Sequence, residues 1–515
     1  MAPFTAKIET IFPGISPVQN FSQEGQFDSS IAIDPDMPVD DSSIRTSGLL
    51  RPTAMAKFSA SEVTGVPHWI VPNPKTSSTY VYANDGKVHV VTSALAMDTA
   101  ITAPSSSSGN GAEYYDNYMY FAKNTDVARY GPLNGVSSLT QSYWVTTLSK
   151  TALVDTTYPS IRGIEIPNHP MHRHAHDNKL YFGDVVGNQG VLHYIKTSKT
   201  TVEGDTDATS TYNALDFPYG YYPTVIESYG TDVAVALIEG VNTTIMQKPA
   251  IVSFWDTTGS SFSKIIDVAF PDPLITAMKN VNGSLYVWSG NASGGVRVSR
   301  FLGGYSFEEV SYSEEGVPPF QGAVDHDMNR IVWGGYTTYP EASAGVLAYG
   351  SKNRKLNMGL HNIFKSTSAG ANGIVTAVKF LEHANNSIRR PIIGWTDDSA
   401  KGLDKISTTY GTSVFRSETF RIGKPWIIHR IRIPFAQAIA ANMTFVVKLY
   451  VDELSSSTTL ATINSTNYAN SERNIVLKPF AAKGNHSFLL EFRWTGTVLL
   501  TAALPVVIEG EINDD

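Results

Sequence analysis

The sequence predicts an all-β protein: a six- or seven-bladed β-propeller with an extended N-terminal arm and a C-terminal β-sandwich. Short alternating runs rich in Val, Ile, Tyr, Phe and Thr recur along the chain, bounded by Asn, Asp and Gly, and this period of two is typical of strands. The apolar pattern i, i+3, i+4, i+7 that marks long helices is hard to find. The chain has 515 residues, 42% of them hydrophobic, which is enough for a large core divided over two or three domains.

The predicted propeller, residues 62–410, rests on a recurring unit, a polar tight turn followed by an alternating apolar strand. Asn-Gly, Asp-Gly and similar pairs supply the positive φ angles of two-residue hairpin turns. The turns lie at residues 84–86, 116–117, 177–178, 230–232, 282–283 and 328–329, and further strands follow in VLHYIK, IVSFWD, VRVSRF and VLAYGS. A weaker seventh unit is predicted from Ile374 to Asp398. A spacing of roughly 30 to 60 residues suits one four-stranded sheet per unit, and radial repetition buries each sheet between its neighbours.

The predicted arm, residues 1–61, is polar, broken by proline and short of strands. Such a segment buries little of itself, so we expect it to lie along its own domain or along a neighbouring subunit. It contains an acidic cluster, Asp34, Asp36, Asp40 and Asp41. These side chains could hold calcium, but the Asp-x-Asp-x-Asp-Gly loop is missing, which favours solvated turn residues.

The predicted sandwich, residues 411–515, contains six strand candidates: VFRSETFRI, WIIHRIRIPF, MTFVVKLYVDE, NIVLKPF, HSFLLEFRWTG and LPVVIEGEI. One face of these strands is expected to pack inward, as with Phe445, Val447, Leu449 and Val451 or Phe488, Leu490, Phe492 and Trp494. Arg430 and Arg432 line one side of the second strand. They could bind acid groups, but protection of an edge strand by charge is the favoured interpretation.

The stretch NHPMHRHAHDNKLYFG, residues 168–183, holds four of the twelve histidines. His172, His174 and His176 would share one face of a strand, as metal ligands can. However, i to i+4 spans roughly 13 Å along a strand, too far for all three to bind one ion through bonds of about 2.1 Å. Two of them could bind an ion with ligands from elsewhere, but a polar strand that lines the channel or faces a loop is favoured. We therefore assign no metal ligand.

Catalytic motifs are not evident. The sequence has no Gly-x-Ser-x-Gly elbow, no phosphate-binding loop and no His-Glu-x-x-His. Propeller glycosidases and sialidases are the enzymes to consider, since they use carboxylates or a tyrosine. The sialidase-type box Ser-x-Asp-x-Gly-x-x-Trp is not met, and the nearest stretch, residues 255–262, has one residue too many between Asp and Gly. The carboxylates in or beside predicted blade strands are Asp177, Asp184, Glu227, Glu239 and Asp325, and acidic residues at hairpins usually serve the turn. No catalytic or cofactor-binding residue is predicted.

The aromatic tract from Phe217 to Pro223, FPYGYYP, has two interpretations. Exposed aromatic rings stack on sugars or anchor protein interfaces. Alternatively, Pro and Tyr simply pack the linker between two blades, and this interpretation is favoured.

Composition excludes several classes of protein. There is no cysteine, which rules out disulfides, thiolate metal sites and cysteine nucleophiles. A net charge of -8 with 17% charged residues does not fit a nucleic-acid binder, which would be strongly basic. The N-terminus MAPFTAKIETIF lacks the features of a signal peptide, and no apolar run approaches the roughly 20 residues of a membrane span.

The stretch GQFDSSIAIDPDMPVDDSSIRTSGLLRPTAMAKFS, followed directly by VPHWIVPNPKTSSTYVYANDGKVHVVTS, resembles the opening of structural proteins from tailed bacteriophages. The resemblance covers roughly residues 25–93, and the rest agrees in architecture. It implies an extended arm, a degenerate propeller and a sandwich, with a place in the virion, often in the tail. No catalytic residue carries over, because the resembling motifs are structural.

Three functions are therefore considered. The first is a non-enzymatic virion component of the tail that assembles with copies of itself and other virion proteins, in particles built in the bacterial cytoplasm. The second is a receptor- or glycan-binding module, and the third is a propeller-type glycan hydrolase. No cofactor, no direct nucleic-acid partner and no membrane span are expected. Deletion of residues 1–60 is expected to abolish assembly under the first hypothesis and to leave binding intact under the second.

Overall fold

In the computed structural model the described residues are 1–9, 26–36, 50–58, 63–101, 111–196, 210–240, 248–258, 266–302, 305–313, 316–337, 342–352, 359–366, 373–383, 386–397, 399–407, 410–439, 441–452, 456–468, 473–479, 482–496 and 500–513. Apart from two short helical turns, η1 (Tyr143–Thr147) and η2 (Gln321–Ala323), their regular elements are strands, which confirms the all-β prediction. No helix in this part of the chain has the length and hydropathy that crossing a bilayer requires.

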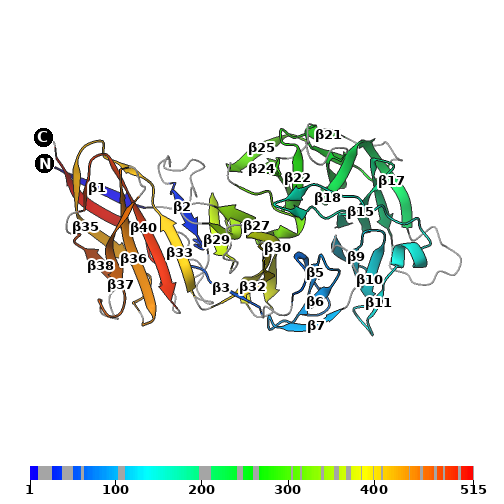
Figure 1. Cartoon of the computed structure of the whole chain (residues 1–515), viewed down its shortest axis with the longest axis horizontal. Coiled ribbons are helices and arrows are strands. Elements are labelled where there is room, and N and C mark those ends of the chain that lie inside the picture. The colour runs from blue at the N-terminus through cyan, green and yellow to red at the C-terminus, as the bar shows by residue number, and fades with distance from the viewer. Residues whose placement is uncertain are drawn as a thin grey trace.

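Seven four-stranded antiparallel sheets, counted among the described residues, stand in a ring (Figure 1). The first three consist of β4 (Pro67–Pro72), β5 (Thr79–Ala83), β6 (Val88–Val91) and β7 (Met97–Ile101); β8 (Ala112–Tyr115), β9 (Tyr118–Ala122), β10 (Val127–Gly131) and β11 (Ser138–Thr140); and β14 (Met171–His174), β15 (Lys179–Val186), β16 (Gln189–Ile195) and β17 (Ser210–Tyr219). The next three consist of β18 (Tyr221–Tyr229), β19 (Asp232–Glu239), β20 (Ile251–Trp255) and β21 (Ile266–Ala269); β22 (Leu274–Val281), β23 (Ser284–Asn291), β24 (Gly294–Phe301) and β25 (Phe307–Ser313); and β26 (Val324–Asp327), β27 (Arg330–Thr337), β28 (Ser343–Tyr349) and β29 (Leu360–Lys365). The seventh consists of β30 (Ile374–His383), β31 (Asn386–Thr396), β32 (Lys401–Ile406) and β3 (Met55–Lys57).

The ring is closed. Each innermost strand contacts the innermost strand of the next sheet, in the order β4, β8, β14, β18, β22, β26 and β30, and β30 contacts β4. This radial arrangement is that of a β-propeller, so the predicted fold class is confirmed. The outermost strand of the seventh sheet, β3, comes from the N-terminal side of the chain, with Met55 opposite Ile406 and Lys57 opposite Asp404 on β32.

The turns that predict the repeat do not all occupy the same place in their sheets. Five of them join the first strand to the second, and φ angles of 52° at Asn178 and 54° at Asn282 explain the choice of asparagine there. The turn at residues 84–86 instead joins β5 to β6, the second and third strands. The prediction that this turn is equivalent to the others is therefore wrong by one strand. Hairpin turns with the same residue types occur both after the first strand and after the second strand of a sheet.

Two further sheets lie beside the ring (Figure 1). One contains β1 (Ala2–Ile8), β41 (Val506–Ile512), β35 (Trp426–Pro434), β38 (Asn474–Leu477) and β39 (Lys483–Gly484). The other contains β2 (Ser29–Ile31), β33 (Tyr410–Arg416), β34 (Phe420–Arg421), β40 (Ser487–Gly496), β36 (Met443–Val451) and β37 (Ser457–Ile463). Side chains from both sheets, among them Trp426, Ile431, Phe445 and Phe492, form one hydrophobic cluster, as expected for packed sheets.

Arg430 and Arg432 lie on an interior strand and not on an edge. Their strand, β35, pairs with β41 on one side and with β38 and β39 on the other, so the edge-strand interpretation is wrong. Each guanidinium lies 3.2 Å from the carboxylate of Glu509 on β41. Exposed ion pairs of this kind add little stability.

Three short strands of the N-terminal segment lie in three different sheets of the same chain. β1 pairs with β41, β2 with β33, and β3 with β32. Phe27, Ile33 and Leu50 also belong to the core between the two sandwich sheets. The described part of the predicted arm thus runs along its own chain. Residues 10–25, 37–49 and 59–61 of that arm, which include Asp40 and Asp41, lie outside the described residues.

A buried ion cluster joins the N-terminal segment to the ring. The carboxylate of Asp34 accepts two hydrogen bonds of 2.8 Å from the guanidinium of Arg330, and Asp327 accepts a third, also of 2.8 Å. All three residues are at most 2% exposed. Burial alone would raise the pKa of Asp34, but Arg330 holds it well below its usual range. Asp34 is therefore an ion-pair partner, and its predicted role as a solvated turn residue is wrong.

Asp36 strengthens the same junction. Its carboxylate accepts hydrogen bonds from the hydroxyl of Ser351 at 2.9 Å and from the main-chain N–H of Lys352 at 2.6 Å. The Nζ of Lys352 in turn lies 3.1 Å from Asp327. The N-terminal segment is thereby bonded to the sixth sheet by both of its described acidic residues from the predicted cluster.

Acid is expected to weaken the fold through His361, which is buried beside this junction. Burial lowers the pKa of His361 to about 3, whereas an unfolded histidine titrates near 6.5. Between these values the unfolded chain binds a proton that the folded chain does not, so the free energy of unfolding falls as the pH drops below about 6.5. The full slope for one such group is about 1.4 kcal/mol per pH unit. Urea unfolding at several pH values between 7 and 5 measures how the free energy of unfolding changes with pH.

The His361→Gln variant is expected to show a smaller fall over this range, because the titrating ring is gone. His429→Gln is the matched control, since His429 is 52% exposed beside Glu511. Equal slopes for the wild type and the His361 variant would contradict the prediction.

Candidate functional site

Polar side chains on the innermost strands bridge neighbouring sheets of the ring. The Nε2 of His172 on β14 lies 2.8 Å from the hydroxyl of Ser228 on β18. Asn280 on β22 donates to the Ser228 carbonyl at 2.7 Å, and Lys379 on β30 donates to Asp325 on β26 at 3.0 Å. These five residues are called the inner polar group below, and they form the candidate functional site near the centre of the ring.

The chemistry of the inner polar group is that of structural contacts. Glu227 lies 3.4 Å from the same His172 nitrogen that meets Ser228. A Ser-His-acid triad needs the acid on the other ring nitrogen, so this is not triad geometry. Asp325 is 1% exposed and also accepts the Phe380 N–H at 2.8 Å. Burial alone would raise the pKa of Asp325, but Lys379 holds it well below its usual range.

The three alternating histidines do not form one site, although the rings of His174 and His176 lie edge to face with their centroids 6.1 Å apart. His172 faces β18, whereas His174 is buried and its Nδ1 lies 3.0 Å from Asp177. β14 ends at His174, so His176 lies in the following turn and not on the strand. No three histidine or acidic side chains within the described ranges gather closely enough to hold a metal ion.

Asp184 forms the most enclosed polar contact of this region. Asn213 donates its main-chain N–H to the Nδ1 of His193 at 2.9 Å, so the Nε2 of His193 carries the proton and faces Asp184 at 3.3 Å. Both His193 and Asp184 are 0% exposed, and burial lowers the pKa of His193. Because the pair is sealed from solvent, it serves the packing of the third sheet.

The other candidate carboxylates also have partners of their own. Asp177 accepts hydrogen bonds from the Lys179 and Tyr181 side chains as well as from His174. Glu239 lies 3.5 Å from the Nζ of Lys248. Asp177, Glu239 and Asp325 lie in or beside blade strands, as predicted. Each lies near a lysine, namely Lys179, Lys248 and Lys379 respectively.

The aromatic tract packs between the third and fourth sheets. Phe217 is 1% exposed, Tyr221 9% and Tyr222 5%. The hydroxyl of Tyr222 donates to Asn188 at 2.5 Å, and that of Tyr221 donates to the Pro249 carbonyl at 3.2 Å. Tyr219, at 67%, is the exposed member. These contacts agree with the favoured interpretation, in which the aromatic residues pack the linker between two blades.

A hairpin of the chain crosses the middle of the ring. It consists of β12 (Ser160–Ile161) and β13 (Ile164–Glu165) and leaves the ring between the second and third sheets. The Arg162 guanidinium at its tip lies over the ring of Tyr336 in the sixth sheet, 4.0 Å from the centroid. Ile164 and Pro167 line a small hollow together with His68 of the first sheet, Thr376 of the seventh sheet and Phe320, which directly precedes η2. The hairpin therefore covers the end of the ring where the inner strands begin.

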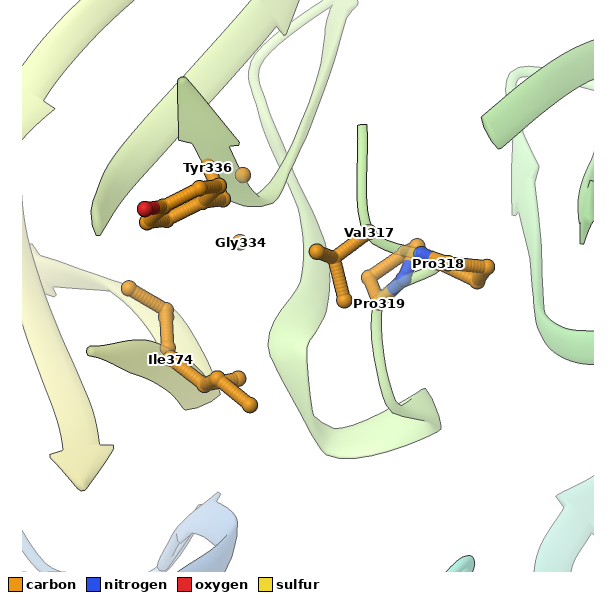
Figure 2. A pocket seen from close by; sticks show the side chains of 8 residues that line it. Val317, Pro318, Pro319, Gly334, Tyr336 and Ile374 are labelled. Atoms are coloured by element: carbon orange, nitrogen blue, oxygen red, sulfur yellow. The ribbon is translucent and has the colours of Figure 1, made fainter. Parts of the chain in front are cut away.

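A pocket lies beside this hairpin, between the sixth and seventh sheets (Figure 2). It is narrow, and it is lined by Val317, Pro318, Pro319, Gly334, Gly335, Tyr336, Ile374 and Val375. A Cβ added at Gly334 would lie 2.9 Å from the Cβ of Val375, so a side chain does not fit there. The lining is mostly apolar, and its one hydroxyl belongs to Tyr336.

The hairpin is expected to stabilise the ring mainly through Ile161. This side chain is 0% exposed within the large cluster that spans several sheets. Ile161→Ala is expected to lower the free energy of unfolding by about 2–4 kcal/mol, and Ile164→Ala by less, because Ile164 is only partly buried. Urea unfolding of both variants measures the difference, and an equal cost would contradict it.

No family model matches this sequence, and no curated protein sequence matches it. Solved structures similar to the chain are β-propellers, at low identity. They include a streptogramin B lyase (10% identity, TM-score 0.42, covering 69% of this chain and 98% of that one), the Neurospora crassa Pan2 WD40 domain (10%, 0.40, 68% and 93%) and the Dos1 propeller (12%, 0.40, 66% and 78%). The functional argument therefore rests on the geometry of this chain.

Proposed function

We propose that this protein is a non-enzymatic structural component of a tailed bacteriophage virion, placed in the tail and present in several copies. The observation that carries the proposal is the course of the N-terminal segment. Residues 25–93 carry the resemblance to phage structural proteins. This stretch includes β2 in the sandwich, β3 in the ring, and Asp34, which pairs with Arg330 of the ring. Because the N-terminal segment bonds to both the sandwich and the ring, it holds the two parts in one arrangement that neighbouring subunits can bind.

The partners of the polar side chains support a structural role, because these side chains bond within the chain. The inner polar group, Asp177, Asp184 and Glu239 each bond to groups of the same chain. The proposed partners are copies of the protein and other virion proteins, with a host-surface glycan or receptor as a further partner and no direct contact to nucleic acid. The proposed location is the virion, after assembly in the host cytoplasm.

Purified phage particles test the proposal. Particles from a phage that encodes this chain are expected to contain it at a fixed copy number by quantitative mass spectrometry, and cryo-electron microscopy is expected to place its ring and sandwich in the tail. A chain found in the lysate but absent from gradient-purified particles would overturn the proposal.

A receptor- or glycan-binding role is the second candidate, and one observation favours it. On the face of the six-stranded sheet that points away from the hydrophobic cluster, Arg416, Lys448 and Arg493 lie next to the carboxylate of Glu491. A glycan array probed with the purified chain separates this role from a purely structural one.

A further inference from the structure

An asparagine followed by a glycine can react with its own main chain, without an enzyme. The glycine nitrogen, once it has lost its proton, attacks the side-chain carbonyl carbon of the asparagine. A succinimide ring forms, the side-chain nitrogen takes up a proton and leaves as ammonia, and water then opens the ring to aspartate or isoaspartate. Glycine favours the attack because it has no β-carbon to hinder it. The described part of the chain contains two such pairs, Asn134–Gly135 and Asn282–Gly283.

The Asn282–Gly283 pair is held in place on both sides of the bond that would have to form. It is the two-residue turn between β22 and β23, with φ angles of 54° and 85°, as in a type I′ hairpin. The Nδ2 of Asn282 donates to the Oδ1 of Asn329 in the next sheet at 3.0 Å. The Gly283 N–H donates to the Oδ1 of Asn280, also at 3.0 Å. Both reacting groups must therefore give up a hydrogen bond before they can meet.

The Asn134–Gly135 pair lies in an open part of the connection between β10 and β11. Asn134, Gly135 and Val136 are consecutive exposed residues, and within the described ranges no hydrogen bond holds the Asn134 side chain. The Gly135 N–H makes one bond, to the Pro132 carbonyl, and its length of 3.3 Å exceeds the usual range. A Cβ added at Gly135 would meet Pro132 only at 3.8 Å. The space around the attacking nitrogen is therefore open.

We propose that Asn134 is a site of spontaneous deamidation in the folded protein, with the Gly135 nitrogen as nucleophile and water as the second reactant. Asn282 is expected to react about tenfold more slowly, because each hydrogen bond that must break adds to the barrier. The product carries a new carboxylate beside β11, the outermost strand of the second sheet. As isoaspartate it also lengthens the main chain by one carbon. The modification goes beyond the proposed structural role and does not depend on it.

Incubation of the whole chain in mildly basic buffer, followed by trypsin digestion and mass spectrometry, tests the proposal. Lysine or arginine residues flank each pair, so the two pairs fall in separate peptides, and a sample digested at time zero corrects for reaction during digestion. In the folded chain Asn134 is expected to convert from amide to acid about tenfold faster than Asn282. In urea, which unfolds the chain, the two rates are expected to converge, because the bonds that protect Asn282 are lost.

Two variants, each checked for folding by circular dichroism, separate the causes. Gly135→Ala is expected to slow the reaction at Asn134 about tenfold, because the new β-carbon crowds the attacking nitrogen. Asn329→Ala removes the partner of the Asn282 side chain, so it is expected to speed the reaction at Asn282 about threefold or more and to leave Asn134 unchanged. The proposal would be overturned if Asn134 reacted no faster than Asn282 in the folded chain. It would also be overturned if the difference between the two persisted in urea.

Discussion

The Arg330→Met variant is expected to lose about 3–5 kcal/mol of unfolding free energy. The substitution keeps much of the side-chain volume but removes the two hydrogen bonds to Asp34 and those to Asp327. Both carboxylates are 1% exposed, so each would lose its bonded guanidinium in a place that water barely reaches. Lys352 remains 3.1 Å from Asp327, but the paired bonds to Asp34 have no replacement. Equilibrium unfolding in urea measures the loss.

Arg432→Met is the control for this variant. Arg432 is 51% exposed and pairs with Glu509, which is 35% exposed, so its loss is expected to cost about 1 kcal/mol or less. The double variant Asp34→Leu with Arg330→Met is expected to recover part of the stability, because it removes the unpaired carboxylate as well. A single Arg330 variant no less stable than the Arg432 variant would contradict the interpretation of the cluster.

Deletion of residues 1–58 is expected to abolish cooperative folding. It removes β1, β2 and β3 together with Phe27, Ile33, Leu50 and Phe58, which are at most 5% exposed. Loss of one large buried apolar side chain costs about 2–5 kcal/mol, and four such losses approach or exceed the 5–15 kcal/mol that hold a typical domain together. Circular dichroism during urea unfolding and size-exclusion chromatography measure the outcome. A truncated chain that unfolds cooperatively with the stability of the full chain would contradict the prediction.

A shorter deletion, of residues 1–9, serves as the control. It removes β1, whose partner is β41 in the sandwich, so the ring is expected to stay folded while the sandwich loses stability. The comparison also changes how the larger deletion is interpreted. Loss of assembly after removal of residues 1–60 would report misfolding, and it would not separate a structural role from a binding role.

Local patterns in the sequence predict the hairpins of the ring because each hairpin is made by neighbouring residues. The seventh sheet is different, since its outer strand β3, the stretch MAK, pairs with residues 404–406. Three residues without alternation carry no strand signal. β1 did carry one, because Phe4, Ala6 and Ile8 alternate with Thr5 and Lys7. The polar composition of the whole N-terminal segment masks this signal.

The candidate site is less predictable because its partners come from different sheets. The alternation of the histidines placed His172 on a strand, but only the ring brings it to Ser228, 56 residues away. Likewise, Asp34 and Arg330 are 296 residues apart, and neither has a local pattern that marks an ion pair. The interior position of Arg430 depends on β41, near the end of the chain.

The pairing of β1 with β41 places the two ends of the chain in one sheet, and this has a consequence for how the protein is made. A ribosome adds about 5–20 residues per second, so β1 emerges roughly 25–100 seconds before its partner is synthesised. β2 and β3 are also synthesised long before their partners, β33 and β32, which begin at residues 410 and 401. During translation the nascent chain exposes unpaired strand edges and apolar side chains to chaperones and proteases. These three strands can pair only after residues 401–512 have been synthesised.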